Sequence, residues 1–201
     1  MNADLFLVWA TRLLVGAHAS GTPSSTAQRI YFANHTSHLD AVTLWSALPP
    51  DFRAKTCPVA ALDYWGANSF RLHVSTRLFH AVLLERKVRT GSDPLAPLRE
   101  KLRSGQSLIL FPEGTRRPQR LPATFKSGLY HLARAFPDID LVPAYLNNLY
   151  RLMPKGSLLP VPLTTGVQFG QPLRLLAGET KPAFLERARQ SVIALASTPP
   201  S

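Results

Sequence analysis

Residues 29–48, RIYFANHTSHLDAVTLWSAL, join a strand-like run to a helical run through a short polar turn. Residues 29–33 are bulky and mostly apolar, which is typical of a buried strand. Residues 39–48 favour a helix, and the two prolines that follow at positions 49 and 50 would end it. A strand that leads directly into a helix is the building unit of α/β proteins.

The same alternation continues along the chain. Further strands are predicted at residues 53–60, 80–84, 107–111, 141–145 and 165–169, and further helices at residues 63–78, 94–103, 125–135 and 182–196. A chain of 201 residues is long enough for one buried core but leaves little for a second. We therefore predict a single α/β domain, residues 28–198, with a mixed, mostly parallel sheet covered by helices.

The composition is that of a folded protein with an anionic partner. Hydrophobic residues make up 45% of the chain and charged residues 17%, the opposite of the balance that intrinsic disorder needs. The net charge is +11, and 17 of the 23 cations are arginine, whose planar fork matches phosphate. A phosphorylated substrate, an anionic membrane surface and a nucleic acid all fit this charge. The single cysteine, Cys57, cannot form an internal disulfide, which favours a reducing compartment.

The N-terminal segment, residues 1–20, is predicted to be a short apolar or amphipathic helix. Its apolar run, residues 5–16, is interrupted by Thr11 and Arg12 and is too short to span a bilayer. The helix could be buried in the core. It could equally lie at a membrane surface, with Trp9 at the interface and Arg12 reaching the headgroups.

Residues 34–40, NHTSHLD, form the first segment that can carry chemistry. Ser37 and Asp40 have the spacing of a capping box at a helix start. This places His35 just outside the helix and Asp40 in its first turn, so that the two side chains can face each other. A carboxylate beside an imidazole fixes its tautomer and stabilises the imidazolium, which is the equipment of a general base.

Two other interpretations of this segment remain open. His35 could simply pack and Asp40 simply cap the helix. A metal site built from His35, His38 and Asp40 is a weaker alternative, since no other His or Cys cluster completes the coordination. We therefore expect no metal.

Residues 111–116, FPEGTR, form the second such segment and follow the clearest strand, residues 107–111. Ligand sites of α/β sheets lie at the carboxyl ends of strands. Gly114 allows backbone N–H groups to approach an anion closely, and Arg116 supplies a fork that fits phosphate. The alternative is an ordinary turn with a solvated arginine.

Four blocks in this order make the chain resemble the 1-acylglycerol-3-phosphate acyltransferases of the glycerolipid acyltransferase family. The blocks are NHTSHLD (34–40), AVLLER (81–86), FPEGTR (111–116) and LVPAY (141–145), within a resemblance that covers residues 29–146. Residues 126–128 also resemble the Lys-x-Gly of the family. Glu85 stands where members often carry Asp, and the N-terminal region is shorter than in many relatives.

The resemblance implies a role for each matching residue. His35 and Asp40 are expected to be catalytic: His35 would deprotonate the acceptor hydroxyl and Asp40 would orient it. A group of six residues is expected to bind the acceptor and its phosphate: Arg86, Glu113, Gly114, Thr115, Arg116 and Lys126, the last with a solvated lysine as the alternative. The acyl donor would be acyl-CoA or acyl-carrier protein as a co-substrate, with no cofactor. The chain offers no G-x-S-x-G elbow, and Cys57 has no obvious adjacent base, which fits direct transfer.

The resemblance also implies phosphatidic acid as the product, phospholipid synthesis as the setting, and the cytoplasmic face of the cell membrane as the location, with peripheral or monotopic attachment. Another lyso-lipid, such as a lyso amino-acid lipid, is the main alternative acceptor. A basic protein without activity that binds membranes or nucleic acid is a remote alternative. Because the aromatic residues do not interleave with the basic ones as stacking platforms do, we expect no nucleic-acid partner.

Overall fold

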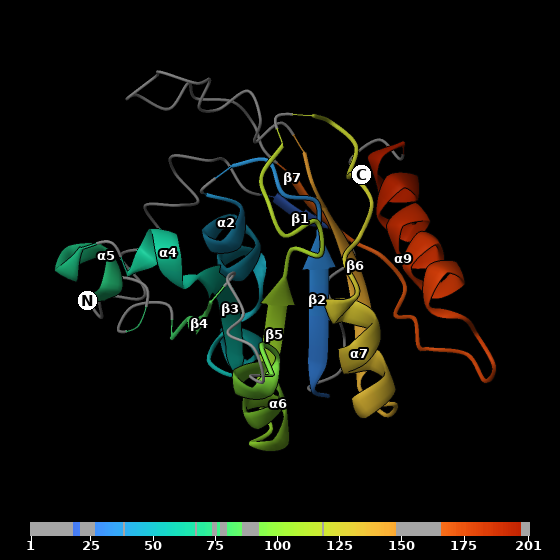
Figure 1. Cartoon of the computed structure of the whole chain (residues 1–201). Helices are drawn as coiled ribbons and strands as arrows, with labels where there is room; N and C mark the ends of the chain where they lie inside the picture. Colours follow the sequence, from blue (N-terminus) through green and yellow to red (C-terminus); the bar gives the residue numbers. More distant parts are fainter. Residues whose placement is uncertain are drawn as a thin grey trace.

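A seven-stranded sheet forms the centre of the computed structural model (Figure 1). The structure describes residues 18–20, 27–37, 39–66, 68–73, 76, 80–85, 93–117, 119–147 and 166–197. Across the sheet, the strands lie in the order β1 (His18–Ser20), β7 (Gly166–Phe169), β6 (Asp140–Leu146), β2 (Arg29–Ala33), β5 (Ser107–Leu110), β3 (Thr56–Ala61) and β4 (Val82–Leu84).

The strand directions confirm the mixed, mostly parallel sheet. β2 lies between β5 and β6 and is parallel to both, with Phe32 opposite Leu110 on one side and Pro143 on the other. β3 and β4 continue this parallel array, whereas β7 runs antiparallel to β6 and carries β1 at its outer edge. The carboxyl ends of β2, β5, β3, β4 and β6 therefore meet at one edge of the sheet, where ligand sites of α/β proteins lie.

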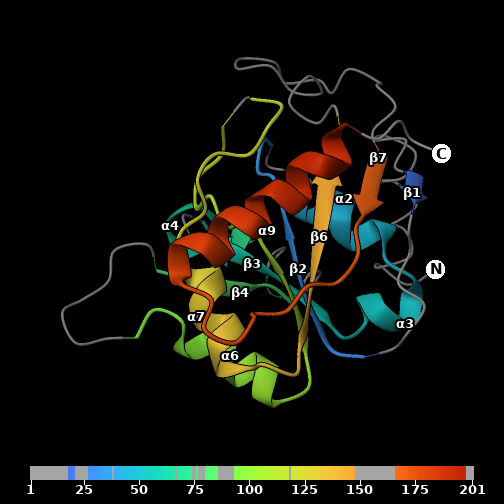
Figure 2. The same ribbon diagram turned by 90° about the vertical axis from the view of Figure 1, so that its right-hand side faces the viewer.

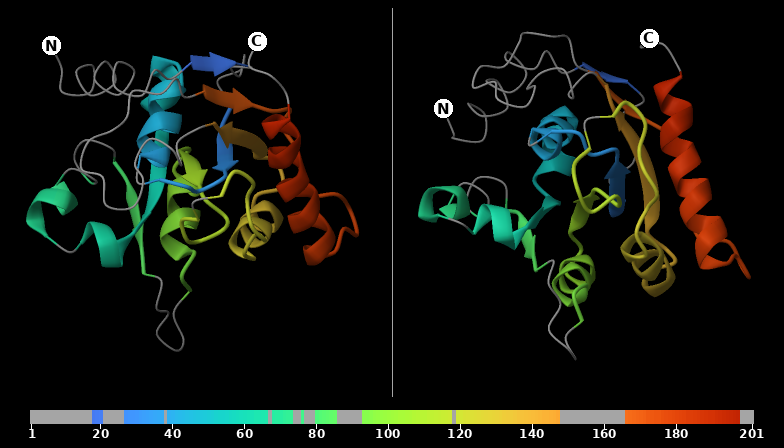
Figure 3. Two further views of the ribbon diagram at one scale, coloured as in Figure 1. Left: turned by 90° about the horizontal axis from the view of Figure 1, so that it is seen from above. Right: turned by 45° about the horizontal axis from the view of Figure 1, so that its top comes forward.

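Helices cover both faces of the sheet. Their bounds are α2 (Asp40–Ala47), α3 (Pro50–Arg53), α4 (Leu62–Trp65), α5 (Ser69–His73), α6 (Ala96–Arg103), α7 (Gly128–Ala135) and α9 (Lys181–Ala196). The turned views show α2 on one side of the sheet and α9 on the other, with α9 running across β6 (Figure 2, Figure 3). α6 and α7 pack on the same face as α9, so the fold has three layers.

Alternation along β2 explains why both faces need a cover. Ile30 and Phe32 are fully buried in the core beneath α6, α7 and α9. Tyr31 and Ala33 point the other way and are buried against α2. Because successive side chains of a strand lie on opposite faces, a strand that is apolar throughout indicates a sheet with two covered faces.

Two of the predicted elements differ in the structure. The helix predicted at residues 63–78 is wrong as one element: its described part includes α4 and α5, and α4 ends at Trp65 with Gly66 as its C-cap. The strand predicted at residues 53–60 begins at Thr56, because Pro50 at the first helical position starts α3 instead.

The predicted N-terminal helix falls largely outside the described residues, which include only 18–20 of residues 1–20. These last three residues form β1 and not a helix, since they pair in parallel with the open edge of β7, His18 opposite Gly166. Within the part of the chain that the structure describes, no helix has the length and apolarity needed to cross a membrane.

Candidate active site

His35 and Asp40 face each other across the turn between β2 and α2, as the sequence predicts. His35 Nδ1 lies 2.8 Å from Asp40 Oδ2. Asp40 is fully buried, whereas 19% of the His35 side chain is exposed. A carboxylate can only accept hydrogen bonds, so the pair requires a proton on Nδ1 and leaves Nε2 as the ring atom that can take another.

Asp40 is itself held by the backbone at the start of α2. Its Oδ2 accepts hydrogen bonds from the backbone N–H groups of Thr36, at 2.5 Å, and Ser37, at 2.9 Å. The positive end of the helix dipole also favours a carboxylate in the first turn. Only half of the predicted capping box forms, because Ser37 Oγ accepts from Leu39 N–H and not from Asp40. The carboxylate is therefore fixed in place before any substrate binds.

The turn after β5 fixes His35 from the other side. The backbone N–H of His35 donates to Glu113 Oε1 at 2.8 Å, and the backbone N–H of Arg117 donates to the carbonyl of His35 at 2.9 Å. The Phe111 ring stacks on the imidazole, with 4.3 Å between ring centroids and an interplanar angle of 20°. The two predicted segments therefore form a single site at the carboxyl ends of β2 and β5.

Gly114 and Lys126 meet at the surface of this site. Gly114 has a φ of +68°, and a Cβ placed on it would lie 2.7 Å from Lys126 Nζ. The backbone N–H of Lys126 also donates to the carbonyl of Pro112 at 2.8 Å. A glycine at this turn therefore lets the lysine side chain lie directly over the backbone.

The other predicted binding residues have different surroundings. Thr115 and Arg116 are exposed on the turn that follows Gly114. Glu113, by contrast, is buried, with 4% of its surface exposed, and its Oε2 accepts from the backbone N–H of Ala123 at 3.0 Å. Arg86 lies outside the described residues, as does His38 of the metal alternative. In the described part of the chain, no three His, Cys, Asp or Glu side chains are grouped as metal ligands.

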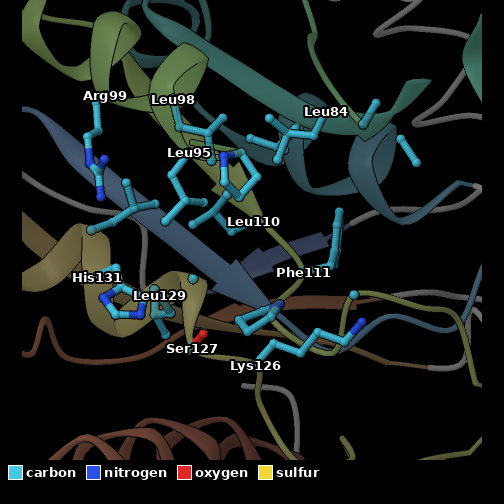
Figure 4. A pocket seen from close by; sticks show the side chains of 18 of the residues that line it. Leu84, Leu95, Leu98, Arg99, Leu110, Phe111, Lys126, Ser127, Leu129 and His131 are labelled. Carbon is cyan, nitrogen blue, oxygen red and sulfur yellow. The ribbon is translucent and has the colours of Figure 1, made fainter. Parts of the chain in front are cut away.

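A cavity of about 610 Å³ opens beside His35. Phe111 and Lys126 lie at one end of it, and Arg99 and His131 lie at the other (Figure 4). Leucine side chains from two strands, β4 and β5, and from α6 with its N-cap and α7 form much of the wall between them: Leu84, Leu95, Leu98, Leu110, Leu129 and Leu132. The site thus combines a hydrogen-bonded imidazole with an apolar space of the size that binds small-molecule ligands.

Sequence reasoning missed Phe111 as a contact of His35, although it is the first residue of FPEGTR. It also missed the cavity wall. The leucines of α6 and α7 have the spacing of ordinary core positions, and no signal in the sequence separates a core face from a face that lines a cavity.

Asn34 is a further residue whose role the sequence does not reveal. Its side-chain amide donates to the carbonyl of Leu146 at 3.1 Å and accepts from the N–H of Leu146 at 2.8 Å. This pair of bonds joins the carboxyl ends of β2 and β6, so Asn34 holds the turn that carries His35 against the sheet.

Comparison with known proteins places these residues in a family. The sequence profile of the acyltransferase family matches residues 17–147. A chloroplastic 1-acyl-sn-glycerol-3-phosphate acyltransferase of Arabidopsis thaliana is 33% identical over 139 residues, which are 67% of this chain and 36% of that protein. The protein of the same name from Brassica napus is 32% identical over 138 residues, or 67% of this chain and 37% of that protein. The matched stretch thus spans little more than a third of the length of these relatives.

The fold has a counterpart of known structure. The crystal structure of the 1-acyl-sn-glycerophosphate acyltransferase of Thermotoga maritima matches with a TM-score of 0.74 and 23% identity, covering 98% of this chain and 80% of that one. The likeness confirms the α/β architecture. Since the family profile matches well over half of the 201 residues and includes all four sequence blocks, the chain belongs to the acyltransferase family.

Proposed function

We propose that the chain transfers a fatty acyl group from the thioester of acyl-CoA or acyl-carrier protein to the free hydroxyl of 1-acylglycerol-3-phosphate, giving phosphatidic acid for phospholipid synthesis. The observation that carries this proposal is the His35–Asp40 pair, bonded at 2.8 Å beside a mainly apolar cavity. The names of the two curated relatives, which the chain matches over a third of their length, support the choice of acceptor.

In the proposed mechanism, Nε2 of His35 takes the proton of the acceptor hydroxyl while Nδ1 stays bonded to Asp40. The resulting oxygen nucleophile attacks the thioester carbonyl carbon, the C–S bond breaks, and the departing thiolate takes the proton back from His35. The buried carboxylate stabilises the imidazolium that exists between these steps. The reaction needs no acyl-enzyme, metal or redox cofactor, and the thioester is a co-substrate.

The acceptor phosphate would bind at the cationic turn after β5. Arg116 and Lys126 extend from this turn and from the segment before α7, and Gly114 leaves room for the Lys126 side chain over the turn. Phosphate favours such a combination of guanidinium and ammonium groups. Arg86 follows β4 in the sequence and remains a proposed second arginine at the phosphate, and Thr115 a proposed neighbour.

The cavity would hold an acyl chain. Its wall is mainly leucine, it begins at His35, and its volume of about 610 Å³ lies in the range of ligand pockets. An acyl chain that entered it would leave its carbonyl or ester end near the imidazole. This arrangement would bring the reacting groups together through apolar contacts made far from the reacting atoms.

The proposed location is the cytoplasmic face of the cell membrane, with peripheral or monotopic attachment. Arg116, Arg117 and Leu121 are exposed on the loop that follows β5, beside the site. Cations with an exposed leucine suit a surface of anionic lipid. We expect the protein to sediment with vesicles that contain phosphatidylglycerol and to be released by salt. Equal binding to neutral vesicles would contradict this attachment.

Thiol release tests the proposed reaction. Purified protein is mixed with a panel of acyl-CoAs, or with acyl-carrier protein, in micelles with or without lysophosphatidic acid. We expect release that depends on lysophosphatidic acid. Release only with another lyso-lipid, such as a lyso amino-acid lipid, would replace the proposed acceptor, and no release with any acceptor and either donor would overturn the enzymatic proposal.

A further inference from the structure

The carboxylate of Glu113 is occupied by the protein itself. Oε1 accepts from the backbone N–H of His35 at 2.8 Å, and Oε2 accepts from the backbone N–H of Ala123 at 3.0 Å. Only 4% of the residue is exposed, and the cavity wall includes its neighbours Pro112 and Gly114 but not Glu113. A carboxylate so placed has little surface left for an acceptor molecule.

These bonds connect three parts of the site. The N–H of His35 belongs to the turn after β2, Glu113 belongs to the turn after β5, and Ala123 lies where the exposed loop returns toward α7. Without the Glu113 carboxylate, the N–H groups of His35 and Ala123 would lose this hydrogen-bond acceptor. A buried donor without an acceptor costs free energy of folding. The other backbone group of His35, its carbonyl, accepts from Arg117 of the same loop.

We propose that Glu113 is a positioning residue that acts on catalysis through the backbone of His35, and not a ligand of the acceptor. The inference rests on the proposed function. Asp40 sets the direction of the imidazole ring through Nδ1, and Glu113 sets the height of the His35 main chain above the cavity by fixing its N–H. Proton transfer depends steeply on the placement of the base, since a misplacement of about 1 Å can cost about 100-fold in rate.

Glu113→Gln is the sharpest test because it keeps the size of the side chain. The amide oxygen still accepts one N–H, but the amide NH₂ then faces the other N–H and cannot accept from it. Glu113→Ala removes both acceptors and serves as the second variant. The matched control is Glu179→Gln, since Glu179 also accepts a backbone N–H, that of Leu176 at 3.1 Å, and lies ahead of α9 away from His35.

Two readouts separate positioning from acceptor binding and from general stability. For Glu113→Gln we expect kcat to fall about 10- to 100-fold, with the acceptor KM within about threefold of the wild type. Amide hydrogen exchange, measured without substrate, should show protection of the His35 N–H reduced about tenfold. Glu179→Gln should leave kcat and the protection of His35 unchanged.

A raised acceptor KM with kcat preserved would overturn the proposal, because it would place Glu113 at the acceptor. Unchanged protection of the His35 N–H in both Glu113 variants would overturn it as well. If the wild type is inactive with every lyso-lipid, the proposed function fails while the exchange experiment still decides whether Glu113 positions His35. Should one Glu113 variant not fold, as judged by circular dichroism, the other supplies both readouts.

Discussion

The turns that follow β2 and β5 lie side by side but are built differently. In the turn after β2, the backbone N–H groups of His35, Thr36 and Ser37 all donate to buried carboxylates. In the loop after β5, residues 114–117 are exposed and carry two arginines. In the proposed reaction, the first turn would hold the base in one position, and the second would present positive charge to the acceptor. The two turns would thus divide the proposed reaction into chemistry and binding.

The largest effect should come from the first turn. His35→Ala removes the base and should lower kcat about 100- to 10,000-fold, the usual contribution of a positioned general base. Steady-state thiol release with saturating acceptor measures it. His73→Ala removes an exposed histidine of α5 and should leave kcat unchanged. Near-wild-type turnover in the His35 variant would remove this residue from the mechanism.

Substitutions in the loop after β5 should instead weaken binding of the acceptor. Arg116→Ala should raise the acceptor KM about 10- to 100-fold, the loss of one or more hydrogen bonds to a charged group, with a much smaller change in kcat. Arg103→Ala, at the other end of the sheet in the last turn of α6, controls for the loss of an exposed arginine. An unchanged KM would mean that Arg116 does not contact the phosphate.

Gly114→Ala tests how the loop holds Lys126. The φ of +68° is costly for alanine, so we expect the free energy of unfolding to fall by about 1–2 kcal/mol. The new Cβ would also push the flexible Lys126 side chain aside and raise the acceptor KM. Gly105→Ala is the matched control: its φ is +79° and nothing lies within 4 Å, so it should cost similar stability without changing KM. Equal KM changes in both variants would contradict the placement of Lys126.

The smallest effect is expected away from both turns. The hydrogen bond from Arg187 lowers the pKa of Glu179 below its ordinary value of 4.5. A lowered pKa in the folded state contributes stability above the unfolded pKa and loses it as pH falls through the folded pKa. Glu179→Gln should therefore reduce the free energy of unfolding at pH 7 by about 1 kcal/mol, since the pair is partly exposed. Denaturant titrations should show that the difference in free energy of unfolding between the wild type and Glu179→Gln decreases below pH 4.5. A difference that increased there would contradict the pairing.

Much of the fold and the central pair could be predicted from the sequence. The alternation of strand-like and helical runs predicts the α/β class. The side chains of β2 are buried on both faces, as a sheet covered by helices on both sides requires. The His35–Asp40 contact follows from the spacing, since a helix that begins between two residues brings them together. A contact between residues this close in sequence depends on local backbone conformation, which the local sequence pattern predicts.

The features that could not be predicted from the sequence depend on contacts between distant segments. The resemblance implies that Glu113 helps to bind the acceptor, whereas its hydrogen-bond partners, the N–H groups of His35 and Ala123, are set by how two turns dock. The cavity likewise depends on how far α6 and α7 stand apart, which the spacing of Leu98 and Leu129 does not reveal. Periodicity describes which face is apolar, but not what the face contacts.

The most direct test of the account is whether the acyl group passes straight to the acceptor. Rapid mixing of the protein with excess acyl-CoA, followed by acid quenching, measures free thiol and the mass of the intact protein. Without acceptor we expect neither a burst of thiol nor an acylated protein, and with lysophosphatidic acid we expect thiol and phosphatidic acid in equal amounts. A burst of one thiol per protein with a matching increase in protein mass would contradict direct transfer by His35.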